Sequence, residues 1–84
     1  MYDYQTERKE LFTESGVEIL TTVRDNVRRL LAEAGAFTEE KAMKGCTGSS
    51  WTMLAAIDYL VEKGEIRRVT EQGSTWGQYQ VFTK

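Results

Sequence analysis

Residues 49–69 read SSWTMLAAIDYLVEKGEIRRV, and this stretch contains a helical pattern of apolar residues followed by a strand-like pattern. Apolar residues at three- and four-residue steps predict a helix that ends near Lys63, with Ser49 or Thr47 as its cap. The inner stripe of this helix consists of Met53, Ile57, Leu60 and Val61. Gly64 ends the helix, and residues 65–70 then have the composition of a β-strand.

Two further helices are predicted upstream. The first covers residues 17–34, because apolar side chains recur on one face and Gly35 follows as a stop signal. That face is formed by Leu20, Val23, Val27, Leu30, Leu31 and Ala34. The second helix is short: Thr38 can cap it, Phe37 can pack back as a staple, and it ends near Lys44.

The two ends of the chain complete the predicted organisation. Residues 71–74 favour a turn and residues 76–82 alternate apolar and polar side chains, so a hairpin with residues 65–70 is expected. Residues 1–16 are predicted to form an N-terminal arm or short helix. The predicted fold class is therefore α+β, with three helices and a C-terminal two-stranded β-hairpin in one domain over residues 17–84.

The amino-acid composition and the net charge argue against several classes of function. The 84 residues suffice for one domain, and the net charge of −2 is the wrong sign for binding nucleic acid by overall charge. Cys46 is the only cysteine and there is no histidine, so we expect no disulfide, metal or cofactor. The missing histidine also removes the usual general base, so no enzyme is expected. Without an apolar run of membrane-spanning length, the expected localisation is cytoplasmic.

The pattern of residues 49–69 resembles the winged helix-turn-helix superfamily. The shared features are a polar cap, a threonine before an apolar residue, spaced apolar positions before a glycine, and arginines entering a wing strand. The matching residues are Thr52, Met53, Ile57, Leu60, Gly64 and Ile66. Residues 77–81 resemble the returning strand of the wing, so the resemblance covers about residues 17–82.

The resemblance implies a small DNA-binding protein, a transcriptional regulator or accessory factor working as a dimer. In the family, the third helix enters the major groove and the wing contacts the backbone. The contacts implied on the third helix are Ser49, Ser50, Trp51, Thr52 and Ala55, and the implied phosphate-binding rim includes Lys41, Lys44, Arg67 and Arg68. None of the helix residues is an Arg, Lys, Asn or Gln, and Asp58 would meet phosphate as a like charge.

Other interpretations stay open at this point. The basic residues could equally be a solvated scatter of charge, and Trp51 could be a core residue. A protein-interaction module would instead use an apolar patch of Trp51, Leu54, Ala55 and Tyr59 on a partner protein. Homodimerisation through the arm and the first helix would explain Tyr2, Tyr4, Leu11 and Phe12. Residues 45–48 also resemble the GxxG loop of KH domains, but too few strands are predicted for that fold.

Overall fold

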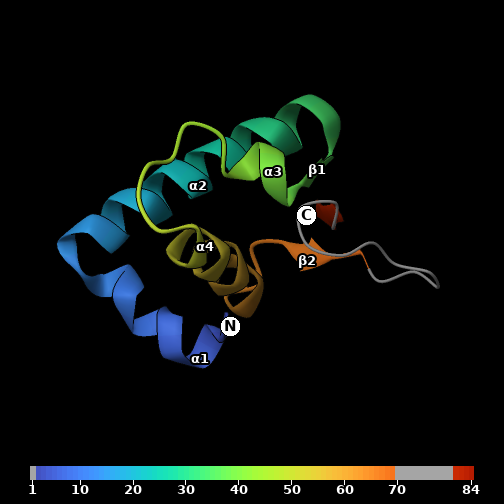
Figure 1. The fold of residues 1–84 in the computed structure, drawn as a ribbon. Coiled ribbons are helices and arrows are strands. Elements are labelled where there is room, and N and C mark those ends of the chain that lie inside the picture. The colour runs from blue at the N-terminus through green and yellow to red at the C-terminus, as the bar shows by residue number, and fades with distance from the viewer. Residues whose placement is uncertain (1, 70–80) are drawn as a thin grey trace.

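Helix α2 (Glu14–Ala34) is the longest element of the computed structural model, which describes residues 2–69 and 81–84 (Figure 1). It begins three residues before the predicted start, because the Thr13 hydroxyl accepts a 3.1 Å hydrogen bond from the Gly16 amide and caps the first turn. Gly35 ends the helix in the left-handed region, with φ of 77°, as the sequence predicted. Ala34, predicted on the inner face, is exposed.

Helices α3 (Glu39–Ala42) and α4 (Ser50–Glu62) form a pair joined by a turn. Ser49 and Lys63 flank α4 as its caps, which matches the prediction, whereas α3 ends two residues before the predicted Lys44. Asn26 of α2 holds the end of α3, since its side-chain amide donates to the carbonyls of Ala42 and Lys44 at 2.9 and 2.8 Å. The position of α3 is thus determined by contacts with α2 as well as by its own short sequence.

The sheet has three strands instead of the predicted two. Strand β1 (Ala36–Thr38) pairs antiparallel with β3 (Val81–Thr83), and β3 also pairs with β2 (Arg67–Arg68), giving the order β1-β3-β2. Phe37 lies opposite Phe82, with stacked rings whose centroids are 5.5 Å apart. A three-residue strand is too short to show alternation, so Phe37 looked like a helix staple. The predicted turn and most of the second hairpin strand lie outside the described residues.

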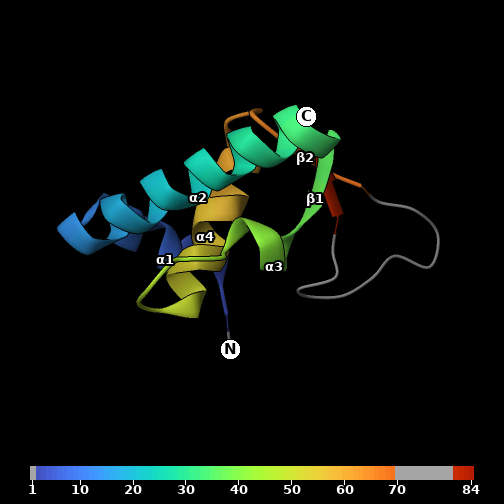
Figure 2. The same cartoon turned by 90° about the horizontal axis from the view of Figure 1, so that it is seen from above.

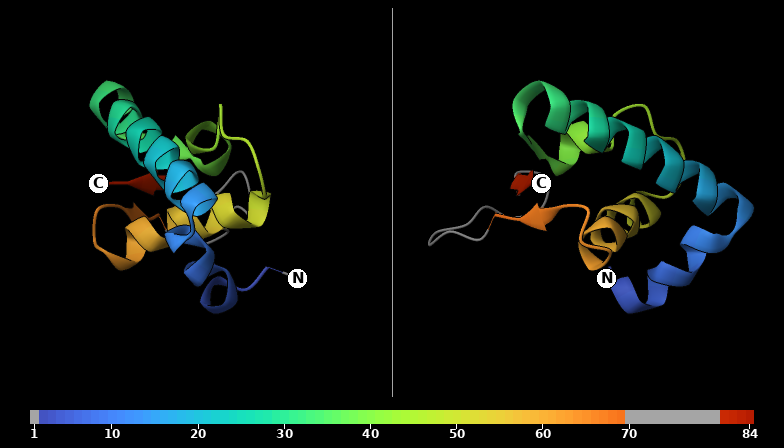
Figure 3. Two further views of the ribbon diagram at one scale, coloured as in Figure 1. Left: turned by 90° about the vertical axis from the view of Figure 1, so that its left-hand side faces the viewer. Right: turned by 180° about the vertical axis from the view of Figure 1, so that it is seen from behind.

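The N-terminal segment consists of α1 (Tyr4–Glu7) and the 3-10 helix η1 (Arg8–Phe12). Both contact α4, which therefore lies between this segment and α2 (Figures 2 and 3). Leu11 is fully buried, whereas α1 has no buried residue. Gly16 permits this packing, because a Cβ there would lie 1.7 Å from the Glu10 carbonyl oxygen. The predicted arm is thus two short helices, anchored by Leu11.

One apolar core joins the N-terminal segment, the helices and the sheet. Its buried side chains are Leu11, Ile19, Leu20, Val23, Val27, Phe37, Ala42, Met53, Ala55, Ala56, Ile57, Leu60, Ile66 and Phe82. The largest fully buried ones come from η1, α2, α4 and β3. Burial of such side chains is the main favourable contribution to folding, so η1 belongs to the same cooperative unit through Leu11.

Candidate nucleic-acid interface

The first turn of α4 is the open part of this helix. Ser49 and Ser50 are exposed, and Trp51 is 42% exposed, so Trp51 is a surface residue. Thr52 and Ala55, which the resemblance implied as DNA contacts, are 7% and 0% exposed. These two expectations were wrong, because both residues lie on the inner side of α4. Small side chains at these positions are what allow neighbouring elements to pack closely.

Two lysines are exposed next to this turn in the chain. Lys41 lies on α3 and Lys44 in the connection that leads to α4. Both line one shallow groove, together with Thr38 and Glu40. The structure thus brings together the two lysines that the sequence singled out. Asn26, which holds the backbone of this region against α2, was not predicted, because a polar residue near a helix surface gives no sequence signal.

The two arginines of β2 differ in their surroundings. Arg67 is exposed, and its Nε donates to the Lys84 carbonyl oxygen at 3.2 Å. Arg68 forms an ion pair with Asp58, and its guanidinium lies 5.2 Å from the centroid of the Phe82 ring. The Arg68 charge is therefore compensated within the molecule, while Arg67 remains open to solvent.

Asp58 is the centre of a polar cluster between α4, β2 and the N-terminal segment. Its Oδ1 accepts from Arg68, and its Oδ2 accepts from the Tyr2 hydroxyl at 2.6 Å. Burial and this hydrogen bond raise the pKa of Tyr2. Burial, followed by the nearby Asp58 charge, raises the pKa of Glu39 on α3, while Arg68 opposes this shift. Asp58 is thus a paired carboxylate and not the free like charge that the sequence indicated.

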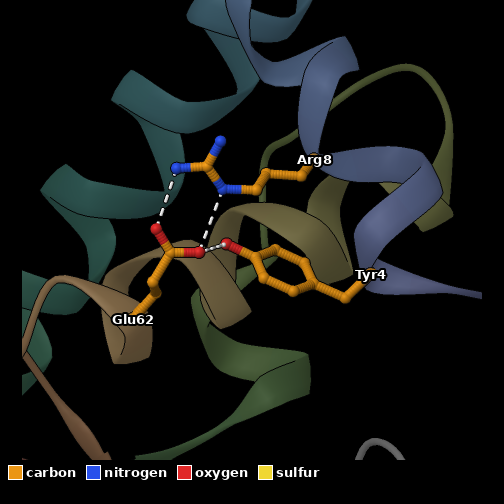
Figure 4. Close-up of polar contacts among 3 residues, drawn as sticks. All are labelled: Tyr4, Arg8 and Glu62. Atoms are coloured by element: carbon orange, nitrogen blue, oxygen red, sulfur yellow. Dashed lines mark hydrogen bonds and ion pairs between the residues drawn. The ribbon is translucent and has the colours of Figure 1, made fainter.

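One turn further along α4, Glu62 binds the N-terminal segment (Figure 4). Arg8 donates through Nε to Oε1 at 2.9 Å and through Nη2 to Oε2 at 2.8 Å, and the Tyr4 hydroxyl donates to Oε1 at 2.8 Å. These hydrogen bonds from Arg8 and then Tyr4 lower the pKa of Glu62 to about 2. Burial, followed by the hydrogen bond to Glu62, raises the pKa of Tyr4 to about 12. The sequence gave no sign of this contact, since 54 residues separate Arg8 from Glu62.

We expect acid to release this contact. The pKa of Glu62 is lowered in the folded protein, so the contact is fully present above the ordinary pKa of a glutamate and is lost as pH falls towards about 2. The protection factors of the amides of residues 6–8, which compare each exchange rate with the intrinsic rate at the same pH, should fall between these limits before those of α2 do. In Glu62→Gln, exchange at residues 6–8 should already be fast at neutral pH. Equal protection in both proteins at neutral pH would contradict this assignment.

The packing of α4 leaves only part of the apolar patch expected for a protein-interaction module at the surface. Ala55 is buried, and Tyr59 is half-buried against Phe12, with ring centroids 5.7 Å apart. Trp51 is the exposed member of the patch, and Leu54 is half-buried like Tyr59. Leu11, Tyr2 and Tyr4 are engaged within the chain, so Phe12, 55% exposed, is what remains of the apolar arm surface expected for a homodimer.

In residues 2–69 and 81–84, no three acidic or cysteine side chains are grouped to hold a metal ion. Cys46 is half-buried beside the core, where burial raises the pKa of its thiol. Over the same residues, no helix has the length and apolar character needed to cross a bilayer. Searches of protein-family models, curated proteins and solved structures found no match for this chain.

Proposed function

We propose that the protein is a small winged-helix protein that binds double-stranded DNA as a transcriptional regulator or accessory factor. The order of elements from α2 to β3 supports this, because a helix, a strand, two helices and two paired strands follow one another. The sheet order β1-β3-β2 places the two last strands side by side, as a wing requires. The proposal assigns the protein no catalytic role and a cytoplasmic location.

The open edge formed by α3, the connecting turn and the start of α4 carries the proposal. Lys41 and Lys44 offer two exposed positive charges, and Ser49 and Ser50 offer hydroxyl groups at the N-terminus of a 13-residue helix. Lysines, hydroxyls and helix N-termini are the groups that contact DNA phosphates. Recognition helices also present their N-terminal residues to the bases, which would place Trp51 at the groove. Arg67 on β2 adds a cation from the wing.

This contact set predicts binding dominated by phosphate contacts. A fluorescence-anisotropy titration of a labelled mixed-sequence duplex should show binding at about 50 mM salt that weakens steeply by about 200 mM, because cations that neutralise phosphates release counterions. Bovine serum albumin, another acidic protein, is the control for nonspecific association. Absence of duplex binding at the lower salt concentration would overturn the proposal.

Protein binding is the second candidate, and the exposure of Trp51 favours it. A tryptophan that is 42% exposed beside the half-buried Leu54 is the type of anchor found at the centre of protein interfaces. The uncharged first turn of α4 and the net charge of −2 suit such a contact. The same salt series separates the candidates, since an apolar interface responds only weakly to ionic strength.

A further inference from the structure

Residues 2–8, which we call the α1 strap, are attached to the rest of the molecule by polar contacts and by the partly buried rings of Tyr2 and Tyr4, which pack against the edge of the core. Helix α1 has no buried residue, whereas Leu11 in the following η1 is 0% exposed. The strap is held by Tyr2 on Asp58 and by Tyr4 and Arg8 on Glu62. Segments with few buried apolar contacts open at a much lower free energy than the core. The strap, which includes Arg8 at the start of η1, can therefore leave α4 while Leu11 keeps the rest of η1 in place.

The strap also covers part of the outer face of α4. Residues of α1, of the end of α4 and of β2 line one shallow groove of about 420 Å³: Tyr4, Gln5, Asp58, Val61, Glu62 and Arg68. Residues near the end of α4 thus share a groove with α1, while Trp51 in the first turn is exposed. Figure 1 shows α1 beside α4 on the side opposite α2. A DNA groove can admit the first turn of α4, but the strap obstructs entry of the whole helix.

The net charge of the strap also opposes DNA binding. The strap contains the acidic residues Asp3 and Glu7 and one basic residue, Arg8. Asp3 is exposed, and the charge of Arg8 is compensated by its ion pair with Glu62. The docked strap therefore brings a net negative charge to the face of α4 that would approach phosphates. Like charges at this position reduce the affinity for DNA.

We propose that the α1 strap is an autoinhibitory element that competes with DNA for the outer face of α4. This inference rests on the proposed DNA-binding function. With the strap docked, the protein contacts DNA through the first turn of α4 and the lysines next to it. With the strap released, the full length of α4 becomes accessible, and binding tightens. The apparent affinity of the released form is thus reduced in proportion to the fraction of the protein in which the strap is released.

The double variant Tyr4→Phe/Arg8→Gln tests this competition in the full chain, because it removes all three hydrogen bonds to Glu62. Loss of a positive charge ordinarily weakens DNA binding, whereas release of the strap should strengthen it by about two- to fivefold. Arg24→Gln is the matched control. Arg24 forms an ion pair with Glu65 at 2.9 Å, close to the 2.8 Å of Arg8 with Glu62, and the arginine side chains are 30% and 34% exposed.

Two readouts distinguish the outcomes: duplex affinity at about 50 mM salt, as in the titration above, and amide hydrogen exchange of residues 6–8. Faster exchange together with tighter binding, neither seen in Arg24→Gln, would support the strap. Faster exchange without tighter binding would overturn it and leave the proposed function intact. Unchanged exchange would overturn it too, because the contacts to Glu62 would not hold α1. If the wild-type protein fails to bind the duplex, the proposed function itself fails.

Discussion

Replacing Leu11 by alanine is expected to lower the free energy of unfolding by about 2–5 kcal/mol, the usual cost of truncating a fully buried leucine. Leu11 is 0% exposed and belongs to the core cluster, although it lies in a 3-10 helix near the start of the chain. The alanine would leave a cavity where η1 meets α2 and α4. Since small domains have only about 5–15 kcal/mol of stability in total, this loss is a large share of it and should lower the midpoint of urea denaturation clearly.

Urea denaturation followed by circular dichroism measures this loss, and the next residue supplies the control. Phe12 is 55% exposed, so Phe12→Ala should cost less than about 1 kcal/mol even though it removes a larger side chain. If the two variants lost equal stability, or if Leu11→Ala unfolded like the wild type, η1 would not belong to the cooperative unit described above.

The double variant Lys41→Ala/Lys44→Ala is expected to weaken duplex binding by a factor on the order of ten to one hundred at about 0.1 M salt. Each lysine that neutralises a phosphate contributes about 0.9 to the slope of log affinity against log salt. The slope should therefore fall by about 2, with similar losses on unrelated DNA sequences, because phosphate contacts carry no sequence information. Anisotropy titrations at several salt concentrations measure both quantities.

Arg28→Ala/Lys84→Ala is the matched control for this experiment. These two cations also line one shared groove, but it lies beside the C-terminal half of α2 and Gly64. The control removes the same net charge from the chain, so its slope should stay close to that of the wild type. An equal fall in both double variants would show that overall charge determines binding, and the open edge at α3 would lose its assigned role.

The helical part of the fold could be predicted because its signal is local. The apolar stripes of α2 and α4 and the glycines that follow them gave the positions of both helices, with errors of a few residues at their starts. The exposure of Lys41 and Lys44 could also be predicted, because lysine side chains are almost never fully buried unless they are paired.

Contacts between segments that are far apart in the sequence determine the third strand, the burial of α4 and the ion pairs. β1 forms because the backbone of Ala36–Thr38 pairs with β3, which lies more than 40 residues later in the chain. A three-residue strand is too short to show an alternating pattern in the sequence. Thr52 and Ala55 are buried because α4 is contacted by α1, η1, α2 and α3, on more sides than its apolar stripe indicated. The sequence by itself therefore determined the α+β class and the main helices through local periodicity. Only the tertiary structure decided that Asp58 and Glu62 are paired with Arg68 and Arg8, because a charge pair depends on distance in space.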